Sequence, residues 1–423
     1  MIPLRSRMLA AAVLSIAVAL PVAGQASAGP DDTPGTAGAA TLTGTPEPHR
    51  PAFYEPPAKI PSTPGTIIRS EPAPLLLDPL GLSSSVVTAT RVMYSSTDRY
   101  GTPIAVTGTV FVPKTPYVGT SKRPQITYAA GTQGMGDRCA PSRQMSDLVE
   151  YEGIGLARSI GRGYAVGMTD YQGLGTPGTH TYMDRKAQGA AVLDMARAVQ
   201  NLEGSGITDA NPVGIMGYSQ GGGAAAAAAE MAGTYAPDLQ LKGSAVGAPP
   251  ADLTATVENA EGGLLGAAVL YGLLGQAQSA RIDLDPYLSA EGRDMAADIE
   301  DHCFLELADY AFQDSSRYLS GGTTVTELLA TEPFKSAVAQ QRIGRTRPSA
   351  PVVINHSVGD EVVPYAVGKQ LGSDWCDKGA NVTFNAGLAP THVGGYVPHI
   401  EKSMLFFEQR FAGSTPPSTC WAL

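Results

Sequence analysis

The residues best suited to chemistry lie in the pentapeptide GYSQG at positions 217–221, which has the pattern Gly-x-Ser-x-Gly. The apolar segment VGIM (213–216) precedes it, and an Ala-rich segment (221–232) follows it. This order predicts a strand, a tight turn and a helix, which is the context of a nucleophile elbow. In such a turn the hydroxyl of Ser219 projects from a strained backbone, and the flanking glycines let strand and helix approach closely. The alternative is a packing turn in which Ser219 has no chemical role.

A serine hydroxyl becomes a good nucleophile only when a base takes its proton and an acid orients that base. After a nucleophile elbow the expected chain order is serine, then Asp or Glu, then His. The apolar segment 350–355 predicts a late strand, and Asp360 follows it in a Gly-containing turn. We therefore predict Asp360 as the acid, with Glu361 as its competitor. The alternative for Asp360 is a cap of the next helix.

The base must be a histidine that follows the acid in the chain. Only His392 and His399 meet this condition among the six histidines. His392 lies in a Gly- and Pro-containing loop after the last predicted strand (381–386), whereas His399 adjoins the last predicted helix. We predict His392 as the base and a structural or surface role for His399.

An acyl-transfer site also needs donors for the oxyanion of its tetrahedral intermediate, and loss of one donor costs about 3–4 kcal/mol. The backbone N–H of Gln220, directly after the serine, is the first predicted donor. The second donor usually comes from a loop after an earlier strand, a place occupied here by AGTQG (130–134). Thr132 or Gln133 would supply it. The alternative is an ordinary Gly-rich connection.

Strands and helices alternate in the part of the chain that would position these residues. Short apolar segments predict strands at 124–128, 164–170, 213–217, 241–248, 350–355 and 381–386, and helices are predicted at 144–160, 185–202, 221–232, 366–374 and 400–411. This alternation favours an α/β fold with a mostly parallel sheet covered by helices on both faces. Before it, the segments 86–94 and 104–112 flank a turn-rich stretch and predict a hairpin.

The alternation stops between residues 249 and 347, where the pattern is helical. Because this block lies between two predicted strands, we expect a helical cap or lid inserted over the carboxyl edge of the sheet. The core would then consist of residues 53–248 and 348–423. The apolar residues near 264–274 would line an acyl channel or form the lid, or would simply pack in the core of the insertion.

Residues 1–28 have the pattern of an export signal peptide. Arg5 and Arg7 precede an apolar stretch (8–20), and Ala-Ser-Ala (26–28) offers a cleavage site. The stretch is too short to span a bilayer of about 30 Å as a helix, and a signal anchor is the alternative. Residues 29–52 are rich in Pro, Gly and Thr and predict a disordered lead-in. We therefore expect a secreted protein that does not insert stably into a membrane.

The composition is that of a globular, loop-rich chain. Of 423 residues, 43% are apolar and 16% are charged, and the chain has 49 Gly and 33 Pro. The net charge of −10 argues against nucleic-acid binding and against electrostatic docking to anionic lipid. The four cysteines lack the paired spacing of a zinc site, so in an exported protein they are expected to be bridged rather than free or metal-bound.

From about Phe53 to its end the sequence resembles the secretory lipase family, typified by the yeast lipase A enzymes and their actinobacterial relatives. The motifs that carry the resemblance are FYEPP (53–57), PGTIIR (64–69), GTQGMGDRCAPS (131–142), DYQGLG (170–175), GYSQGG (217–222) and GDEVVPY (359–365). The resemblance implies an α/β-hydrolase fold with a helical lid and a triad of Ser219, Asp360 and His392. It also implies two disulfides, Cys139–Cys303 and Cys376–Cys420.

The motifs and the resemblance together predict a secreted serine carboxylic-ester hydrolase that uses no metal or organic cofactor. We favour a lipase that cleaves acylglycerol esters through an acyl-enzyme and contacts a lipid interface only transiently. An acidic residue is implicated in the oxyanion loop of yeast members, and the corresponding place here holds Thr132 or Gln133. The alternatives are an esterase for another bulky ester, such as an antibiotic or toxin ester, and an acyltransferase. A peptidase and an inactive binding protein are further alternatives.

Overall fold

The computed structural model describes residues 50–73, 83–119, 121–147 and 150–423. The predicted signal peptide at 1–28 and almost all of the predicted lead-in at 29–52 lie outside the described residues. In the part that is described, no helix is both long enough and apolar enough to cross a membrane.

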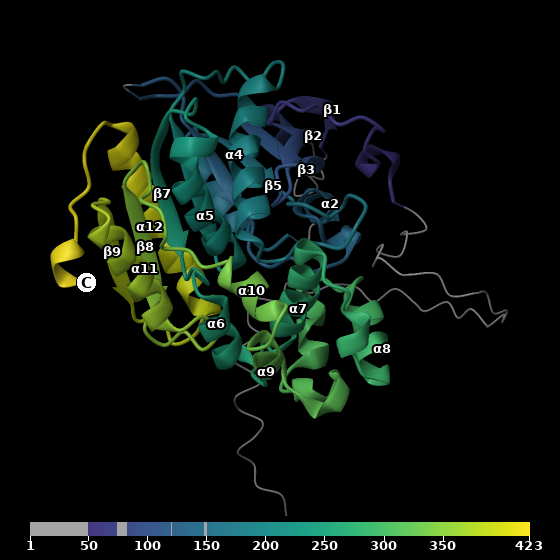
Figure 1. The fold of residues 1–423 in the computed structure, drawn as a ribbon. Helices are drawn as coiled ribbons and strands as arrows, with labels where there is room; N and C mark the ends of the chain where they lie inside the picture. Colours follow the sequence, from purple (N-terminus) through teal and green to yellow (C-terminus); the bar gives the residue numbers. More distant parts are fainter. Residues whose placement is uncertain (1–49, 74–82, 120, 148–149) are drawn as a thin grey trace, which may run out of the picture. The chain divides into compact units, whose positions relative to one another are not determined.

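The described residues form one nine-stranded sheet with the order β1-β2-β3-β5-β4-β6-β7-β8-β9. Its strands are β1 (Ile67–Pro72), β2 (Val87–Thr97), β3 (Pro103–Pro113), β4 (Gln125–Ala129), β5 (Ala165–Thr169), β6 (Val213–Tyr218), β7 (Leu241–Gly247), β8 (Val352–Ser357) and β9 (Val382–Gly387). The pairs β1–β2, β2–β3 and β3–β5 are antiparallel, and all other pairs are parallel (Figure 1). The predicted mostly parallel sheet and the predicted hairpin, β2–β3, are therefore confirmed.

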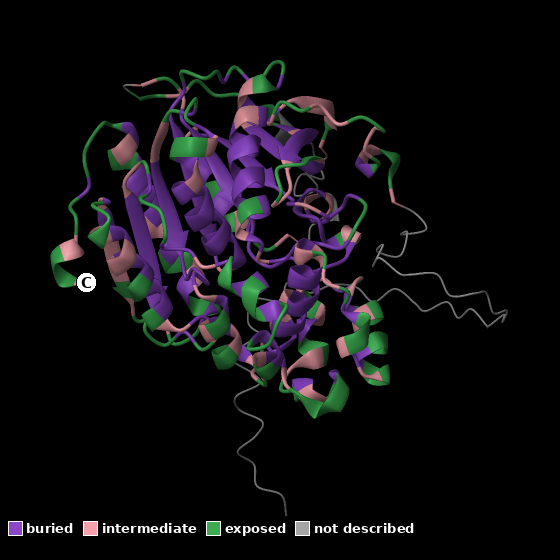
Figure 2. Ribbon diagram, viewed as in Figure 1, coloured by how far each residue is buried: buried purple, intermediate pink, exposed green. Residues whose placement is uncertain are grey.

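Helices cover both faces of this sheet. The helices α4 (Arg185–Asn201), α5 (Gln220–Tyr235) and α11 (Tyr365–Asp377) pack on one face, whereas α3 (Gly153–Gly161) and α12 (Tyr396–Phe411) pack on the other. On the first face, the indole N–H of Trp375 in α11 donates to Glu230 in α5 at 3.0 Å. Figure 2 shows that the central strands β4 to β8 are almost continuously buried. Burial on both faces explains why these strands read as apolar runs in the sequence.

One predicted helix is wrong. The pattern at 144–160 predicts a single helix, but the structure has α2 (Pro141–Asp147), then a turn at Tyr151 and Glu152, and then α3. The carboxyl group of Glu152 accepts the backbone N–H of Gly131 at 3.1 Å and is buried there. A contact with a distant loop thus fixes the turn that separates the two helices.

Residues 249–347 lie between β7 and β8 and are all described, and they add no strand to the sheet. Their α-helices are α6 (Leu253–Ala260), α7 (Ala267–Ala280), α8 (Ala290–Ile299), α9 (Val325–Leu329) and α10 (Phe334–Ala339), which Figure 1 draws in green. We call this segment the insertion. Most of its buried apolar side chains form a cluster separate from the core of the sheet, and this cluster also includes Met135 and Tyr182 from loops after β4 and β5. The insertion therefore has its own core and packs on those loops.

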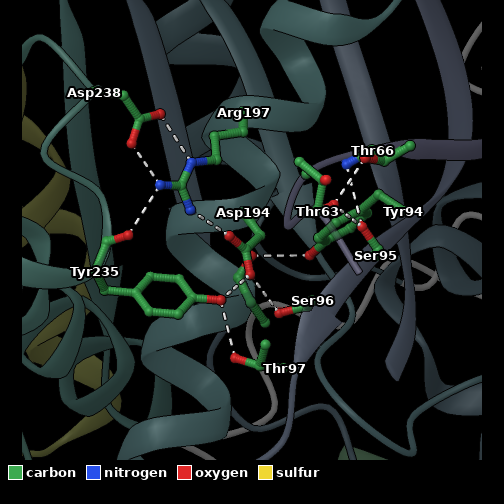
Figure 3. A network of polar contacts seen from close by, with 12 residues as sticks. Thr63, Thr66, Tyr94, Ser95, Ser96, Thr97, Asp194, Arg197, Tyr235 and Asp238 are labelled. Carbon is green, nitrogen blue, oxygen red and sulfur yellow. Dashed lines mark hydrogen bonds and ion pairs between the residues drawn. The ribbon is translucent and has the colours of Figure 1, made fainter. Parts of the chain in front are cut away.

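A polar network joins the hairpin β2–β3 to helix α4 (Figure 3). The carboxylate of Asp194 accepts from the hydroxyls of Ser96 and Tyr235 at 2.7 and 2.8 Å. It also accepts from Arg197 at 2.9 Å, and Arg197 in turn pairs with Asp238. Burial raises the pKa of Asp194 to about 6 despite these contacts. The short helix α1 (Ser83–Val86) leads into β2. The polar contacts with α4 and the pairing of β2 with β3 together hold this antiparallel part of the sheet in place.

Candidate active site

Ser219 lies in the turn between β6 and α5. Its backbone has φ 58° and ψ −122°, a conformation that is rare and costly for a residue with a side chain. The first turn of α5 passes very close to the ends of the neighbouring strands β4 and β7. A Cβ atom on Gly221 would lie 2.1 Å from the carbonyl oxygen of Ala129, and one on Gly222 would lie 2.0 Å from that of Gly247. Only glycine fits at these positions, and the strained turn projects the Ser219 side chain at the carboxyl edge of the sheet.

The loops after β8 and β9 bring an acid and a histidine to this serine. The Nε2 atom of His392 lies 2.8 Å from Ser219 Oγ, and its Nδ1 atom lies 2.8 Å from Asp360 Oδ2. The other carboxylate oxygen, Oδ1, accepts the backbone N–H groups of Val362 and Val363 at 3.0 and 2.8 Å. The backbone of the loop therefore fixes the carboxylate, and the carboxylate faces the imidazole.

The protonation states follow from these contacts. Burial of Asp360 opposes its charge, but contacts with His356 and His392 outweigh this effect and hold the pKa of the Asp360 carboxyl well below its usual range. The ionised carboxylate accepts the Nδ1–H of His392, which leaves Nε2 free to accept the hydroxyl proton of Ser219. His356, whose Nε2 donates to the carbonyl of Val363 at 2.9 Å, lies 3.4 Å from the same carboxylate oxygen.

The two competitors from the sequence occupy other positions. Glu361 accepts the backbone N–H of His392 at 2.7 Å, so it contacts the loop and not the imidazole. His399 is buried in α12, where its Nδ1 accepts from the side chain of Asn355 at 3.1 Å, and burial lowers its pKa to about 3. The structure thus brings Asp360 and His392 to Ser219 and places Glu361 and His399 elsewhere.

The loop at 130–134 leaves the sheet beside the serine, because β4 pairs with β6 up to Ala129 opposite Gly217. The hydroxyl of Thr132 lies 2.6 Å from the Tyr182 hydroxyl, and the Thr132 carbonyl accepts from Tyr151 at 2.8 Å. The side chain of Gln133 contacts a different part of the structure. Its amide donates to Glu150 at 3.2 Å and its oxygen accepts from Gln144 at 3.1 Å.

Two acids, the buried Glu152 and the partly buried Glu150, support this loop and were not predicted from the sequence. Burial raises the pKa of Glu150 to about 7, and burial together with the neighbouring Glu150 charge raises the pKa of Glu152 well above its usual range. Both acids fall in the segment predicted as one helix, so the sequence carries no local signal for this role. Gln220, the first residue of α5, is also buried, and its side-chain amide contacts His180 at 3.0 Å.

Two disulfides link segments that are distant in the sequence. Cys139, after the loop at 130–134, is bonded to Cys303 in the insertion, and Cys376 in α11 is bonded to Cys420 near the end of the chain. These are the pairs that the resemblance implies. The first disulfide connects the segment that follows the loop at 130–134, the candidate oxyanion loop, covalently to the insertion. Backbone pairing between Gly134 and Cys303, an isolated antiparallel β-bridge, adds to this connection.

A family model for secretory lipases matches residues 140–419. A protein of Mycobacterium tuberculosis described as a probable inactive lipase is 30% identical over 377 residues, which cover 85% of this chain and 82% of the relative. A secreted triacylglycerol lipase of Malassezia furfur is 26% identical over 311 residues, which cover 69% of this chain and 80% of the relative. The residues matched by the family model include the loops that carry the serine, the acid and the histidine.

The crystal structure of lipase A from Candida antarctica in its closed state superimposes with a TM-score of 0.78 at 23% identity. The match covers 89% of each chain. This likeness confirms the predicted α/β-hydrolase fold.

Proposed function

The chain belongs to the secretory lipase family, and we propose that it is a secreted serine carboxylic-ester hydrolase that cleaves acylglycerol esters. The observation that carries the proposal is the continuous hydrogen-bonded path from Ser219 Oγ through the His392 ring to Asp360, with both contacts at 2.8 Å. A nucleophile, a base and an orienting acid at hydrogen-bond distances are what acyl transfer requires.

In the proposed reaction, Ser219 Oγ attacks the ester carbonyl carbon while His392 Nε2 takes the hydroxyl proton. Asp360 stays ionised and stabilises the imidazolium. Collapse of the tetrahedral intermediate breaks the bond to the leaving alcohol, which receives the proton from His392. Water then attacks the acyl-enzyme with His392 again as base, and release of the carboxylic acid restores Ser219. The balance of the two steps needs only the ester and water.

For the oxyanion, we propose the backbone N–H groups of Gln220 and Thr132 as donors. Gln220 directly follows the nucleophile, as this role requires. The N–H of Gly131 is already donated to Glu152, and the Gln133 side chain is held by Glu150. The hydroxyl of Thr132 contacts Tyr182 and its carbonyl accepts from Tyr151, and on this fixed position we choose Thr132 over Gln133 as the donor in the loop after β4.

We also propose that the chain is exported after removal of residues 1–28 and that the insertion acts as a cap over the site. The export pattern, the two disulfides and the secreted relatives support the first part. The disulfide between Cys139 and Cys303 and the packing of the insertion on Met135 and Tyr182 support the second.

The proposal is tested by comparing wild-type protein with Ser219→Ala on a panel of esters: tributyrin, triolein, p-nitrophenyl butyrate and a bulky acetate ester. We expect wild-type hydrolysis, labelling of Ser219 by a fluorophosphonate, and a loss of about 10⁵- to 10⁶-fold in kcat for Ser219→Ala. Equal rates for both proteins would refute the proposal. Preference for the bulky acetate ester would identify the alternative esterase, and a product with an added alcohol would identify an acyltransferase.

A further inference from the structure

The segment between β5 and α4, residues 170–184, is a loop that is mostly buried. Loops usually run over the surface, because a buried loop must satisfy its backbone polar groups internally. This loop contacts three other parts of the structure. The hydroxyl of Tyr171 donates to the carbonyl of Ala130 at 2.8 Å, and further contacts reach the start of α5 and helix α7 of the insertion.

His180 connects this loop to the residue that follows the nucleophile. Its Nδ1 lies 2.9 Å from the carbonyl oxygen of Gln172, and a carbonyl can only accept, so Nδ1 carries the hydrogen. Burial lowers the pKa of His180 to about 4, so the ring is neutral at pH 7. Its Nε2 must then accept from the side-chain amide of Gln220, 3.0 Å away. The ring of His180 is fixed between those of Tyr171 and Tyr182.

Tyr182 connects the same loop to the second candidate donor and to the insertion. Its hydroxyl lies 2.6 Å from that of Thr132. Its carbonyl accepts from Gln276 in α7 at 3.0 Å, and its ring packs edge-on against Tyr271 of the same helix. Tyr182 is 2% exposed, so these contacts are shielded from water.

We propose that His180 and Tyr182 are positioning residues that hold Gln220 and Thr132, the two proposed oxyanion donors, in one rigid unit anchored to the insertion. The proposal rests on the proposed function. Donors that are fixed before the reaction stabilise developing charge without reorganisation, and a displacement of about 1 Å can reduce a rate by about 100-fold. A neutral histidine suits this role because it fixes an amide without adding a charge beside the oxyanion.

The sharpest test is a double-mutant cycle with Tyr182→Phe and Thr132→Val, measured on p-nitrophenyl butyrate. Both changes remove one side of a single hydrogen bond and keep the backbone N–H of residue 132. We expect Tyr182→Phe to lower kcat and kcat/KM together by about 10- to 100-fold with KM within about twofold. Because the hydroxyl of Tyr182 acts through Thr132, the double variant should lose no more than Thr132→Val alone.

The matched control is Tyr94→Phe. Tyr94 is also fully buried, and its hydroxyl contacts Thr169 and Ala191 at 2.7 and 2.9 Å, in the hairpin–α4 region of Figure 3. This control should lower the melting temperature and leave kcat/KM unchanged. An equal loss of activity in Tyr182→Phe and Tyr94→Phe, a change confined to KM, or independent effects in the double variant would each overturn the proposal.

His180→Gln tests the other half of the unit. We expect lower kcat with a pH profile of unchanged shape, because the neutral His180 does not titrate in the assay range. A shifted acid limb in His180→Gln would make this histidine a titrating participant and would overturn its positioning role. Failure of the proposed function is distinguishable, since wild-type protein and Ser219→Ala would then hydrolyse the ester equally.

Discussion

The contacts of Asp360 predict that Asp360→Asn will remove most of the hydrolytic activity and keep the fold. Asparagine has the same size, and its Oδ1 can still accept the N–H groups of Val362 and Val363. Its amide NH₂ would then face His392 in place of the carboxylate oxygen. His392 Nδ1 would become an acceptor, so the ring hydrogen would move to Nε2, and Nε2 could no longer take the proton of Ser219.

The expected magnitude follows from the distance between acid and base. The imidazolium forms 2.8 Å from Asp360 Oδ2, and the centres of the two delocalised charges lie roughly 3–4 Å apart. At an effective dielectric constant of about 20, unit charges at that distance attract by roughly 4–6 kcal/mol. This attraction exists only when the imidazolium has formed, so its loss appears in the barrier. Since about 1.4 kcal/mol corresponds to a factor of ten, we expect kcat to fall by about 10³- to 10⁴-fold.

The assay is initial-rate hydrolysis of p-nitrophenyl butyrate at pH 8 by wild-type protein, Asp360→Asn and Glu361→Gln. Glu361 is the matched control, because it is the adjacent acid and its side chain accepts the backbone N–H of His392 rather than facing the imidazole. Glu361→Gln should change kcat by less than about tenfold, since an amide oxygen can still accept that N–H. Comparable activity in Asp360→Asn and wild type, or a larger loss in Glu361→Gln, would refute the assigned acid.

Three further outcomes concern stability. In Gly222→Ala the new Cβ would lie 2.0 Å from a backbone carbonyl oxygen of β7, so urea titration should show that the free energy of unfolding falls by about 3 kcal/mol or more. In the control Gly223→Ala the nearest atom is a side-chain carbon at 3.3 Å, and the free energy of unfolding should change by less than about 1 kcal/mol. Burial lowers the pKa of His399 to about 3, so the folded state binds fewer protons than the unfolded state below about pH 6.5, and the free energy of unfolding decreases as the pH is lowered. Between pH 7 and pH 4, His399→Gln should therefore lose about 3 kcal/mol less stability than wild type. An equal loss would contradict the assignment. Replacement of Cys139 and Cys303 by serine should lower the free energy of unfolding by about 2–5 kcal/mol, and a reductant should then have less effect on the variant than on wild type.

The sheet could be predicted from the sequence because its signals are local. All six residues of β6, Val213–Tyr218, are buried, so the strand must be an apolar run bounded by turns. The edge strand β1, Ile67–Pro72, is only partly buried and lies in a Pro-rich segment, and its sequence carries no local signal for a partner strand. The break between α2 and α3 depends on Glu152 reaching Gly131, a contact that no local pattern contains.

The same distinction applies to the site. Ser219, Asp360 and His392 follow strands β6, β8 and β9, and the carboxyl ends of parallel strands meet at one edge of a sheet. Their order in the chain was therefore enough to predict that they lie together. The supporting residues could not be predicted, because they act across loops. His180 contacts Gln220 from a distance of 40 residues, and its sequence neighbourhood carries no motif that indicates this contact.

Membership of a lipase family does not by itself decide whether the chain is active, since the family includes a relative described as probably inactive. The argument for activity rests on features that are unfavourable for stability alone. Ser219 has a backbone conformation that costs roughly 1–3 kcal/mol for a residue with a side chain, where glycine would fit without strain. Asp360 keeps its charge although it is buried, because contacts with His356 and His392 outweigh the effect of burial. A turn that only had to pack would need neither the strained serine nor the buried charge, so their joint presence within hydrogen-bond reach of His392 favours a working hydrolase over a relic of one.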